Sequence, residues 1–506
     1  FADDLVLLSD SWDGMYKNIG ILEAFCGLSG LKVNSAKCHG FFIAGGTKTA
    51  GRINNCPPWK LGGAEIHMVG PQESVRYLGV DINPWKGFRK PDVVGELETF
   101  GSRIAGAPLK PSQKIELLGS FAVPRLMYGA IHSSVSQRVL LRADLVIRRL
   151  IKEWLHMSPF TTNGLLYSKN MDGGLGVPCV SRSVPLGISR RIFGLMHSGD
   201  FTTSEMARRM FDSNEFGRRW LNGGGSKDHL PQALADLTDP ECESFPAPDG
   251  WRDLEFDKWT KMGPQGFGVG MFKKDKLSNS WLAGQGRAWW KESHFIRALQ
   301  MRANVLPTLE FRHRGAGLVF APPCRACGAA PETSSHILGG CVETKLNRMA
   351  RHNRICNLLA AVGRRKQWMV VQERRITSLS GRWGVPDLVF IRGNVLMVVD
   401  VTVRFDGTME WLEQAKEEKV SKYSPFLPVL ALEFPLVTSL TAHGFVMGVR
   451  GKWLMSNRHI LETLGMSKTG IVQFAKTCSR TTILKSVDVF QAFNKQVRGK
   501  VIPTDL

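Results

Sequence analysis

The sequence lacks a long uninterrupted apolar run, which argues against a membrane-spanning protein. Its most apolar stretch, around Pro425–Leu440, is broken by Pro428, Glu433 and Pro435, whereas a spanning helix needs about 20 consecutive apolar residues. Paired cysteines are also scarce, because ten cysteines are scattered singly through 506 residues except for one cluster. A small disulfide-stapled secreted fold is therefore excluded, and a reducing compartment is expected.

An initiator methionine and a signal peptide are absent as well. The sequence opens within a pattern, at Phe1-Ala2-Asp3-Asp4, so we expect an N-terminal part of the protein to be missing. Positive charge, in contrast, is abundant. Lysine and arginine number 66 against 45 aspartate and glutamate residues, which gives a formal net charge of +21. This excess favours a polyanionic partner, with nucleic acid as the first candidate. At 43% hydrophobic residues, the chain is long enough for several globular domains.

The densest candidate site lies in the C-terminal part of the chain. Two runs rich in β-branched and large apolar residues, Asp387–Arg392 and Val395–Val403, flank Gly393-Asn394, which is a two-residue hairpin signal. A two-residue turn at this point places Asp387 directly opposite Asp400. Two like charges at a cross-strand pair are destabilising, but hard cations such as Mg²⁺ bind carboxylate oxygens. The register therefore predicts a magnesium site.

The segment after this hairpin supplies a lysine. Glu410–Tyr423 contains neither glycine nor proline and is predicted to be helical, with Leu412, Ala415 and Lys419 along one stripe. We therefore expect Lys419 to face the carboxylate pair. The alternative explanation is a buried hairpin with a chance acidic pair at its end, followed by a solvated charged helix.

Two adjacent carboxylates, Asp3 and Asp4, precede an apolar run at the start of the chain. Phosphoryl-transfer enzymes use such carboxylates to hold two metal ions about 3.5–4 Å apart, although a turn is the more ordinary interpretation of an isolated Asp-Asp. Two further motifs follow in order. Gly30–Lys37 reads G-L-K-V-N-S-A-K, and Val75–Val80 reads V-R-Y-L-G-V and is predicted to be a strand.

Together these three motifs resemble those of the reverse transcriptases of non-LTR retrotransposons. In that family F/Y-A-D-D is the metal-binding palm motif, G-L-x-x-N-x-x-K follows it, and Y-L-G belongs to the strand that holds the primer end. The resemblance implies two magnesium ligands, an active-site cation and a primer-positioning segment, which are in turn Asp3 and Asp4, Lys37, and Tyr77, Leu78 and Gly79. The family's third metal-binding aspartate lies upstream of the first motif, so we expect that this fragment alone does not extend a primer.

The middle of the chain is predicted to be helical at first and loop-rich later. Lys114–Leu126 and Leu140–His156 carry apolar residues at helical spacing and arginines on other faces, as in a thumb against a duplex. Asp172–Val177 resembles the G-G-L-G segment that closes this region in the same family, and we assign it a structural role. Ser181 to about Gln285 contains glycine-rich and proline-rich stretches and is expected to be a linker.

Arginines alternate with aromatic residues in the next block, Gly286–Gly315. Such a block suits bases that stack and phosphates that meet guanidinium groups, while an amphipathic helix with buried aromatics explains it equally well. We take Arg302 from this block as a candidate nucleic-acid contact. Arg348, Arg351 and His352, on a helix-like stretch farther on, are further candidates.

Between these two regions lies the cysteine cluster. Cys324, Cys327, His336 and Cys341 have the spacing C-x2-C-x8-H-x4-C. A tetrahedral Zn²⁺ ion takes four such ligands, and a site filled entirely by protein is structural. We therefore predict a zinc knuckle, with a longer central gap than in retroviral knuckles. Cys356, just beyond it, is expected to be a core residue.

The order of palm motif, knuckle and P-D…D…K resembles one branch of these elements. These are the site-specific retrotransposons, typified by those inserting into ribosomal-RNA genes, whose C-terminal endonuclease is of the restriction-enzyme type. The resemblance implies that Asp387 and Asp400 bind the metal and that Lys419 or Lys422 is the catalytic lysine. Ordinary restriction-type nucleases place this lysine two residues after the second acid, where Thr402 stands here.

We therefore predict a multidomain α+β protein. Its expected parts are a reverse transcriptase palm remnant, a helical thumb, a linker region, a structural zinc knuckle with a basic flank, and an α/β restriction-like nuclease domain of the PD-(D/E)xK type. In the same order, these are residues 1–89, 90–180, 181–300, 301–356 and 357–506.

The resemblance implies target-primed reverse transcription. The nuclease would nick double-stranded target DNA, ribosomal DNA by analogy with the branch, and the polymerase of the full-length protein would extend the new 3′-hydroxyl on the element's RNA. It implies Mg²⁺ at both active sites, structural Zn²⁺, no membrane partner, and action in the nucleus after synthesis in the cytoplasm. Two alternatives stay open: a nucleic-acid-binding protein from a decayed element, and a stand-alone restriction-type nuclease.

Overall fold

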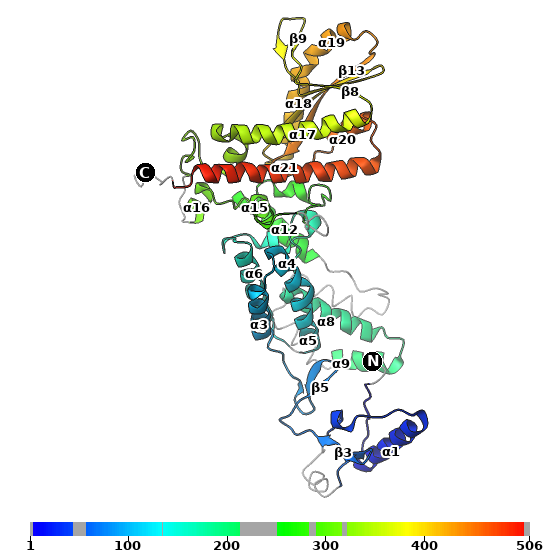
Figure 1. The fold of residues 1–506 in the computed structure, drawn as a ribbon. Coiled ribbons are helices and arrows are strands. Elements are labelled where there is room, and N and C mark those ends of the chain that lie inside the picture. Colours follow the sequence, from blue (N-terminus) through cyan, green and yellow to red (C-terminus); the bar gives the residue numbers. More distant parts are fainter. Residues whose placement is uncertain are drawn as a thin grey trace. The chain divides into compact units, whose positions relative to one another are not determined.

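A computed structural model describes residues 4–43, 57–133, 135–212, 250–282, 290–315 and 321–499 (Figure 1). It divides the chain into two compact units of interleaved segments. Unit one is Phe1–Phe100, Ser120–Val146 and Val180–Pro246, and unit two is Gly101–Gly119, Ile147–Cys179 and Ala247–Leu506. Helices and strands occur in both, so the mixed α+β class is confirmed. The boundaries of the five predicted domains stay predictions, and much of the predicted linker, residues 213–249 and 283–289, lies outside the described residues.

Unit one begins with a helix that packs on short strands. Helix α1 (Trp12–Ser29) starts after Ser11, whose Oγ accepts a hydrogen bond from the backbone N–H of Gly14 at 3.2 Å. It ends at Gly30, where a φ of 71° suits a residue without a Cβ. A buried cluster of Ile19, Trp59 and Leu61 joins the helix to the strands. The short elements that follow are η1 (Ser35–Lys37), β1 (His39–Gly40), β2 (Lys60–Leu61), β3 (Ala64–Glu65) and β4 (His67–Met68).

A three-stranded antiparallel sheet comes next, formed by β5 (Val75–Tyr77), β6 (Val80–Asn83) and β7 (Gly87–Phe88). The prediction of one continuous strand over Val75–Val80 is wrong in its middle. Leu78 and Gly79 have φ values of 46° and 81° and form the two-residue turn between β5 and β6. Positive φ at both central residues is what a tight hairpin with the right twist requires.

The predicted helical region is confirmed. Lys114–Leu126 spans α4, η2 and the start of α5, and Leu140–His156 corresponds to α6. The buried Asp144 on α6 accepts hydrogen bonds from the first backbone N–H groups of α8, those of Val180 at 2.8 Å and Ser181 at 3.1 Å. The helices of this region are α3 (Val93–Gly106), α4 (Pro111–Leu117), η2 (Leu118–Ala122), α5 (Val123–His132), α6 (Gln137–Trp154), α7 (Asn163–Tyr167), η3 (Asn170–Asp172), α8 (Val180–Met196) and α9 (Phe201–Asp212).

The main sheet of unit two has the strand order β13-β12-β11-β8. Its strands are β8 (Met369–Gln372), β11 (Leu388–Arg392), β12 (Val395–Arg404) and β13 (Ser439–Gly448). β11 pairs antiparallel with both β8 and β12, whereas β12 pairs parallel with β13. The crossover between the parallel strands is made by α18 (Met409–Tyr423), η7 (Ser424–Phe426) and α19 (Leu427–Glu433). The central β12 is buried over most of its length, as expected for a strand covered on both faces.

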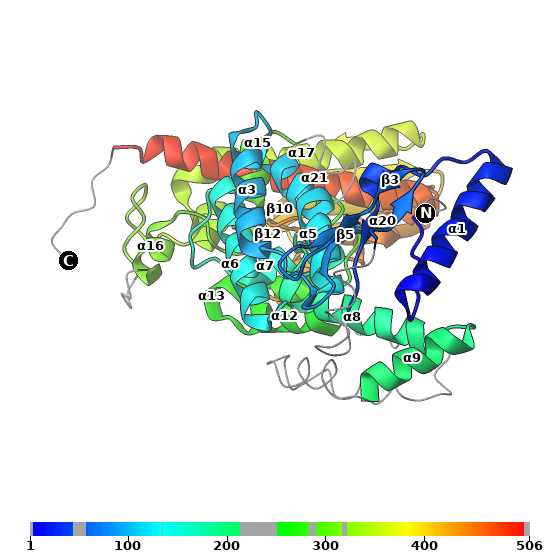
Figure 2. The same ribbon diagram turned by 90° about the horizontal axis from the view of Figure 1, so that it is seen from below.

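Helices cover both faces of this sheet. α17 (Lys345–Arg365) and α21 (Lys468–Gln496) lie side by side (Figures 1 and 2). They enclose one core with Phe390, Met397 and Phe445 of the strands. On the other face, Val389 and Val398 pack with residues of α18 and η7. The remaining elements of unit two are α12 (Gly250–Lys261), α13 (Gly263–Gly266), η4 (Val269–Phe272), α15 (Glu292–Arg302), α16 (Leu309–Gly315), η5 (His336–Gly340), η6 (Val342–Thr344), β9 (Ile376–Thr377), β10 (Trp383–Gly384) and α20 (Asn457–Thr463). None of the described helices is long and apolar enough to cross a membrane.

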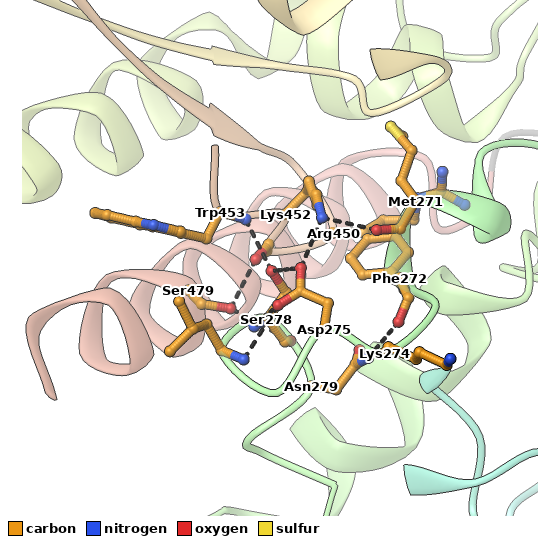
Figure 3. A network of polar contacts seen from close by, with 12 residues as sticks. Met271, Phe272, Lys274, Asp275, Ser278, Asn279, Arg450, Lys452, Trp453 and Ser479 are labelled. Carbon is orange, nitrogen blue, oxygen red and sulfur yellow. Dashed lines mark hydrogen bonds and ion pairs between the residues drawn. The ribbon is translucent and has the colours of Figure 1, made fainter. Parts of the chain in front are cut away.

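A buried polar network ties residues 267–279 to the turn after β13 (Figure 3). Lys452 Nζ donates to Asp275 Oδ2 and to the Met271 carbonyl oxygen, both at 2.7 Å. Close by, the Arg450 guanidinium pairs with Asp406 at 2.9 Å, and both side chains are 0% exposed. Arg450 also donates to the carbonyl oxygen of Phe267 at 2.9 Å. Part of the predicted linker region is therefore held at the end of the main sheet by hydrogen bonds and ion pairs.

Replacing Arg450 by alanine is expected to lower the free energy of unfolding by about 3–5 kcal/mol, because the Asp406 carboxylate would stay buried without its partner. Chemical denaturation followed by circular dichroism measures this change. Arg458→Ala, which removes an exposed partner of Glu462 four residues away, is the matched control and is expected to cost about 0.5 kcal/mol or less. Equal losses in the two variants would contradict a structural role for the buried pair.

Candidate active site and metal centre

The predicted hairpin register is confirmed. Arg392 faces Val395, Ile391 faces Leu396 and Val389 faces Val398, and the ladder ends at Leu388 opposite Val399. Asp387 immediately precedes β11, so the same register sets it against Asp400 of β12. The Asp387 carboxylate is fixed at this end of the hairpin, since its Oδ2 accepts a hydrogen bond from the backbone N–H of Val401 at 2.6 Å.

Lys419 reaches the second carboxylate from α18. Its Nζ lies 2.6 Å from Asp400 Oδ2, and the Asp400 side chain is only 5% exposed. Burial raises the pKa of the Asp400 carboxyl, the nearby Asp387 raises it further, and the Lys419 ammonium opposes the rise. Close packing supports this position, because a Cβ at Gly444 of β13 would lie 3.1 Å from Lys419 Cβ. Lys422 instead is exposed, with its Nζ 4.7 Å from the centre of the Tyr423 ring.

Tyr423, at the end of α18, also lies at this site. Its buried hydroxyl donates a hydrogen bond to the carbonyl oxygen of Val385 at 2.9 Å, two residues before Asp387. Burial raises the pKa of this phenol, and the Asp400 carboxylate raises it further. The end of α18 is therefore tied to the segment that leads into β11.

His352 of α17 contacts the first carboxylate, although the sequence indicated a nucleic-acid contact for it. Its Nε2 lies 3.0 Å from Asp387 Oδ2 and 3.0 Å from the Val401 carbonyl oxygen. Burial lowers the pKa of the imidazole, but hydrogen bonds to Asp387 and Cys356 outweigh burial and raise the pKa to about 11. The ring is cationic at neutral pH. A usable signal was present in the sequence, because His352 stands four residues before the buried Cys356 and so shares its helix face.

His352, Cys356 and Asp387 also have donor atoms within 4.8 Å of one another. The ordering of this trio is explained without an ion, because the cationic imidazole donates to the carboxylate. Cys356 is a buried member of the main core, as predicted, and burial raises the pKa of its thiol.

The four predicted zinc ligands lie together. Donor atoms of Cys324, Cys327, His336 and Cys341 are all within 4.8 Å of one another, and Cys327 Sγ lies 3.2 Å from His336 Nε2. Thiolate–zinc bonds of about 2.3 Å in a tetrahedron require donors this close. Burial raises the pKa of the Cys341 thiol to about 12, so the thiol proton must leave when a cation binds. The residues present therefore fit one Zn²⁺ ion.

A buried carboxylate and an arginine of α17 hold the loops that carry these ligands. Glu332 is 0% exposed and pairs with Arg325 at 2.6 Å, which fixes the turn between Cys324 and Cys327. Arg348 donates to the carbonyl oxygen of Gly339 at 2.8 Å and to that of Cys341 at 3.0 Å. Arg348, predicted to contact DNA, is half-buried and faces the knuckle.

Two other predicted nucleic-acid contacts are corrected. Arg302 is 1% exposed, lies 3.5 Å from the centre of the Phe272 ring and donates to Asn279 Oδ1 at 2.5 Å. Arg351 is 2% exposed and donates to Ser486 Oγ at 3.0 Å and to the Leu338 carbonyl oxygen at 2.9 Å. Neither guanidinium offers a surface to a phosphate, so both are structural in this fold. For the aromatic-rich block that contains Arg302, the described residues therefore favour the alternative explanation, an amphipathic helix with buried aromatic side chains.

The predicted polymerase residues lie in unit one. Asp3 falls outside the described residues, whereas Asp4 is exposed before α1. Lys37 is exposed in η1, and Tyr77 is half-buried at the end of β5. Gly79 occupies the β5–β6 turn, where the hydroxyl of Tyr128 donates to the Leu78 carbonyl oxygen at 2.7 Å. The roles of these residues stay predictions.

Comparison with known proteins defines a class. No family model matches the sequence. The relatives are Pol polyproteins of retrotransposable elements, and they are of the R2 type. A type-1 element R2 polyprotein of Popillia japonica is 26% identical over 92% of this chain and 92% of its own length. A second polyprotein from the same organism is 29% identical over 94% of this chain and 63% of its own length. The R2DM polyprotein of Drosophila melanogaster is 25% identical over 90% of this chain and 41% of its own length. The predicted resemblance to non-LTR retrotransposon polyproteins is confirmed.

We predict that the purified protein carries one zinc ion per chain and that Cys324→Ser abolishes its binding, because a tetrahedral site loses much of its affinity with one thiolate. Cys356→Ser is the matched control, since that thiol belongs to the core and is expected to leave the zinc content unchanged. Metal analysis by mass spectrometry measures both. Zinc that survives in the first variant, or disappears from the second, would refute this ligand set.

Proposed function

We propose that this chain is the reverse transcriptase and endonuclease part of an R2-type retrotransposon polyprotein, and that unit two contains the nuclease that nicks target DNA. The proposal rests above all on Lys419 Nζ, 2.6 Å from Asp400 on a hairpin whose register sets Asp387 opposite. The names and extent of the R2 relatives support the polyprotein assignment.

Asp387 and Asp400 are the proposed magnesium ligands. Their mutual repulsion is only partly offset by Lys419, and hard cations prefer such carboxylate oxygens. A bound Mg²⁺ ion would polarise the scissile phosphate and activate a water molecule. Lys419 opposes the rise in the pKa of Asp400, and it would place an ammonium beside the position of that phosphate, where negative charge develops in the transition state.

His352 is a positioning residue in this proposal. Its cationic ring and the backbone N–H of Val401 both donate to Asp387 Oδ2, which fixes the rotation of the carboxylate. A carboxylate held in this way presents its remaining lone pairs in one direction. In this proposal His352 positions the metal ligand Asp387, instead of contacting DNA as the sequence predicted.

The polymerase part of the proposal rests on motif order and on the relatives. Asp3 and Asp4 would bind Mg²⁺, Lys37 would supply an active-site cation, and Tyr77 with Gly79 would position the primer. The full-length protein would then extend the nicked 3′-hydroxyl on the element's RNA, in the nucleus, with double-stranded ribosomal DNA as the proposed target. A decayed element copy would keep these motifs without nicking activity.

The nuclease proposal predicts different effects for the two candidate lysines. With Mg²⁺ and supercoiled plasmid, Lys419→Met is expected to lower the nicking rate by about 100-fold or more, because it removes a preorganised positive charge. Lys422→Met is the matched control and should nick at nearly the wild-type rate, since its ammonium lies over Tyr423 rather than at Asp400. Conversion of supercoiled to open-circular plasmid on agarose gels measures the rate.

Asp400→Asn keeps the shape of the side chain and removes its charge, so it is expected to abolish nicking. A wild-type protein that nicks no faster than Asp400→Asn would contradict the nuclease proposal and favour the decayed copy. A greater loss for Lys422→Met than for Lys419→Met would reverse the assignment of the lysine.

A further inference from the structure

A short hairpin stands immediately before the first catalytic-site strand. β9 pairs antiparallel with β10, with Thr377 opposite Trp383 and Ile376 opposite Gly384. The segment 374–386 contains three arginines and no acidic residue. In Figure 1 it lies at the end of unit two where α19 is found, and Arg374 pairs with Glu433 of that helix.

The stem of this hairpin is fixed to the residues that hold Asp387. Ile376 is 4% exposed and belongs to the same core cluster as Tyr423 and Phe426. A Cβ at Gly384 would lie 2.7 Å from the Phe426 ring, so the stem lies directly on that side chain. At its base, the backbone N–H of Glu373 donates to the Asp387 carbonyl oxygen at 3.1 Å. The hairpin therefore has a defined position relative to the carboxylates.

The tip is ordered by its own hydrogen bonds. Ser378 is buried, and its backbone N–H donates to the Arg382 carbonyl oxygen at 2.7 Å. Its Oγ accepts from the backbone N–H of Arg382 at 3.1 Å. A loop closed in this way holds its outward side chains in one arrangement before anything binds.

Those outward side chains are apolar and cationic. Leu379 is 71% exposed and Trp383 is 64% exposed. The Arg375 guanidinium lies 4.8 Å from the centre of the Trp383 ring, and Arg375 and Arg382 are both exposed. Large apolar side chains that are exposed on an ordered loop indicate a contact surface. Arg375 and Arg382 are exposed and form no ion pair among the residues that the structure describes, which favours an anionic partner.

We propose that this hairpin is a wedge that enters the target duplex beside the scissile phosphate. Leu379 and Trp383 would occupy an opened base step, as apolar wedges do in the minor groove, while Arg375 and Arg382 contact the flanking phosphates. Only Val385 and Pro386 separate the stem from Asp387, so the step that is opened lies next to the bond that is cut. The inference rests on the proposed nuclease function, because it takes duplex DNA as the occupant.

The test uses all 506 residues of this chain in a catalytically inactive form, so its outcome does not depend on nicking. A nicked plasmid is incubated with Asp400→Asn protein, sealed with DNA ligase and freed of protein, and its topoisomers are separated on a gel. A wedge that opens base steps unwinds the duplex, so the bound protein is expected to lower the linking number of the sealed plasmid.

The informative variant adds Leu379→Ser and Trp383→Ser to Asp400→Asn. At equal occupancy, set by gel shift, it is expected to lose the linking-number change, while its affinity falls by about tenfold or less because phosphate contacts remain. Leu346→Ser, in the same inactive background, removes a side chain that is 78% exposed on α17 and is the matched control. It should keep the full topological change.

A conservative pair, Leu379→Met with Trp383→Phe, should restore the change, and circular dichroism shows whether each variant is folded. If the serine pair unfolds the protein, Leu379→Ser alone replaces it, because that side chain is the more exposed.

An unchanged linking number with the parent protein, or the same change with the serine variant, overturns the wedge. A shift from dimer to monomer in sedimentation, with topology unaltered, would instead assign the hairpin to contact between two copies. Absence of nicking by the wild-type protein would overturn the nuclease proposal. The wedge is tested separately, by the linking number.

Discussion

The arrangement of unit two depends on one electrostatic constraint, two carboxylates that a hairpin register holds opposite each other at the end of a buried sheet. Such a pair is destabilising unless cations offset it. Lys419 approaches Asp400 from α18 at 2.6 Å, and His352 approaches Asp387 from α17 at 3.0 Å. Each helix layer thus contributes a cation to the same end of the sheet. The charges of the proposed metal site also join the layers.

Buried cations also occur elsewhere in the chain, so its net charge overstates the positive charge at the surface. Arg302, Arg351 and Arg450 are almost fully enclosed, and desolvation lowers the pKa of Arg302 to about 9 and that of Arg351 to about 10. Their guanidinium groups hold carbonyl oxygens and side chains from distant segments, which a planar group with five donors does well. Part of the +21 net charge is therefore structural. The positive surface available to nucleic acid is smaller than composition indicates.

The parts that the sequence predicted correctly are those governed by local rules. A two-residue turn sets the register of Asp387 and Asp400, helical spacing turns Lys419 inward, and ligand spacing groups Cys324 with its partners. The failures involve long-range burial. Arg302 resembles a phosphate ligand in sequence, and its partners Asn279 and the Arg450 carbonyl oxygen lie 23 and 148 residues away. The Val75–Val80 error has a different cause, because positive φ values at Leu78 and Gly79 form a tight hairpin turn within a run whose valine and tyrosine residues favour a strand.

Helix α17 links the proposed zinc knuckle to the proposed nuclease. Arg348 and Arg351 hold the carbonyl oxygens of the loop between His336 and Cys341, and the next residue, His352, holds Asp387. A helix is stiff over one turn, so displacement of the arginines by an unfolded loop would also displace the imidazole. We therefore interpret the proposed knuckle as a support for the helix that positions Asp387, rather than as an independent nucleic-acid-binding module. This arrangement also explains why Arg348 and Arg351 face inward, although the sequence predicted that they contact nucleic acid. The buried carbonyl oxygens of the loop need hydrogen-bond donors, and the two guanidinium groups supply them.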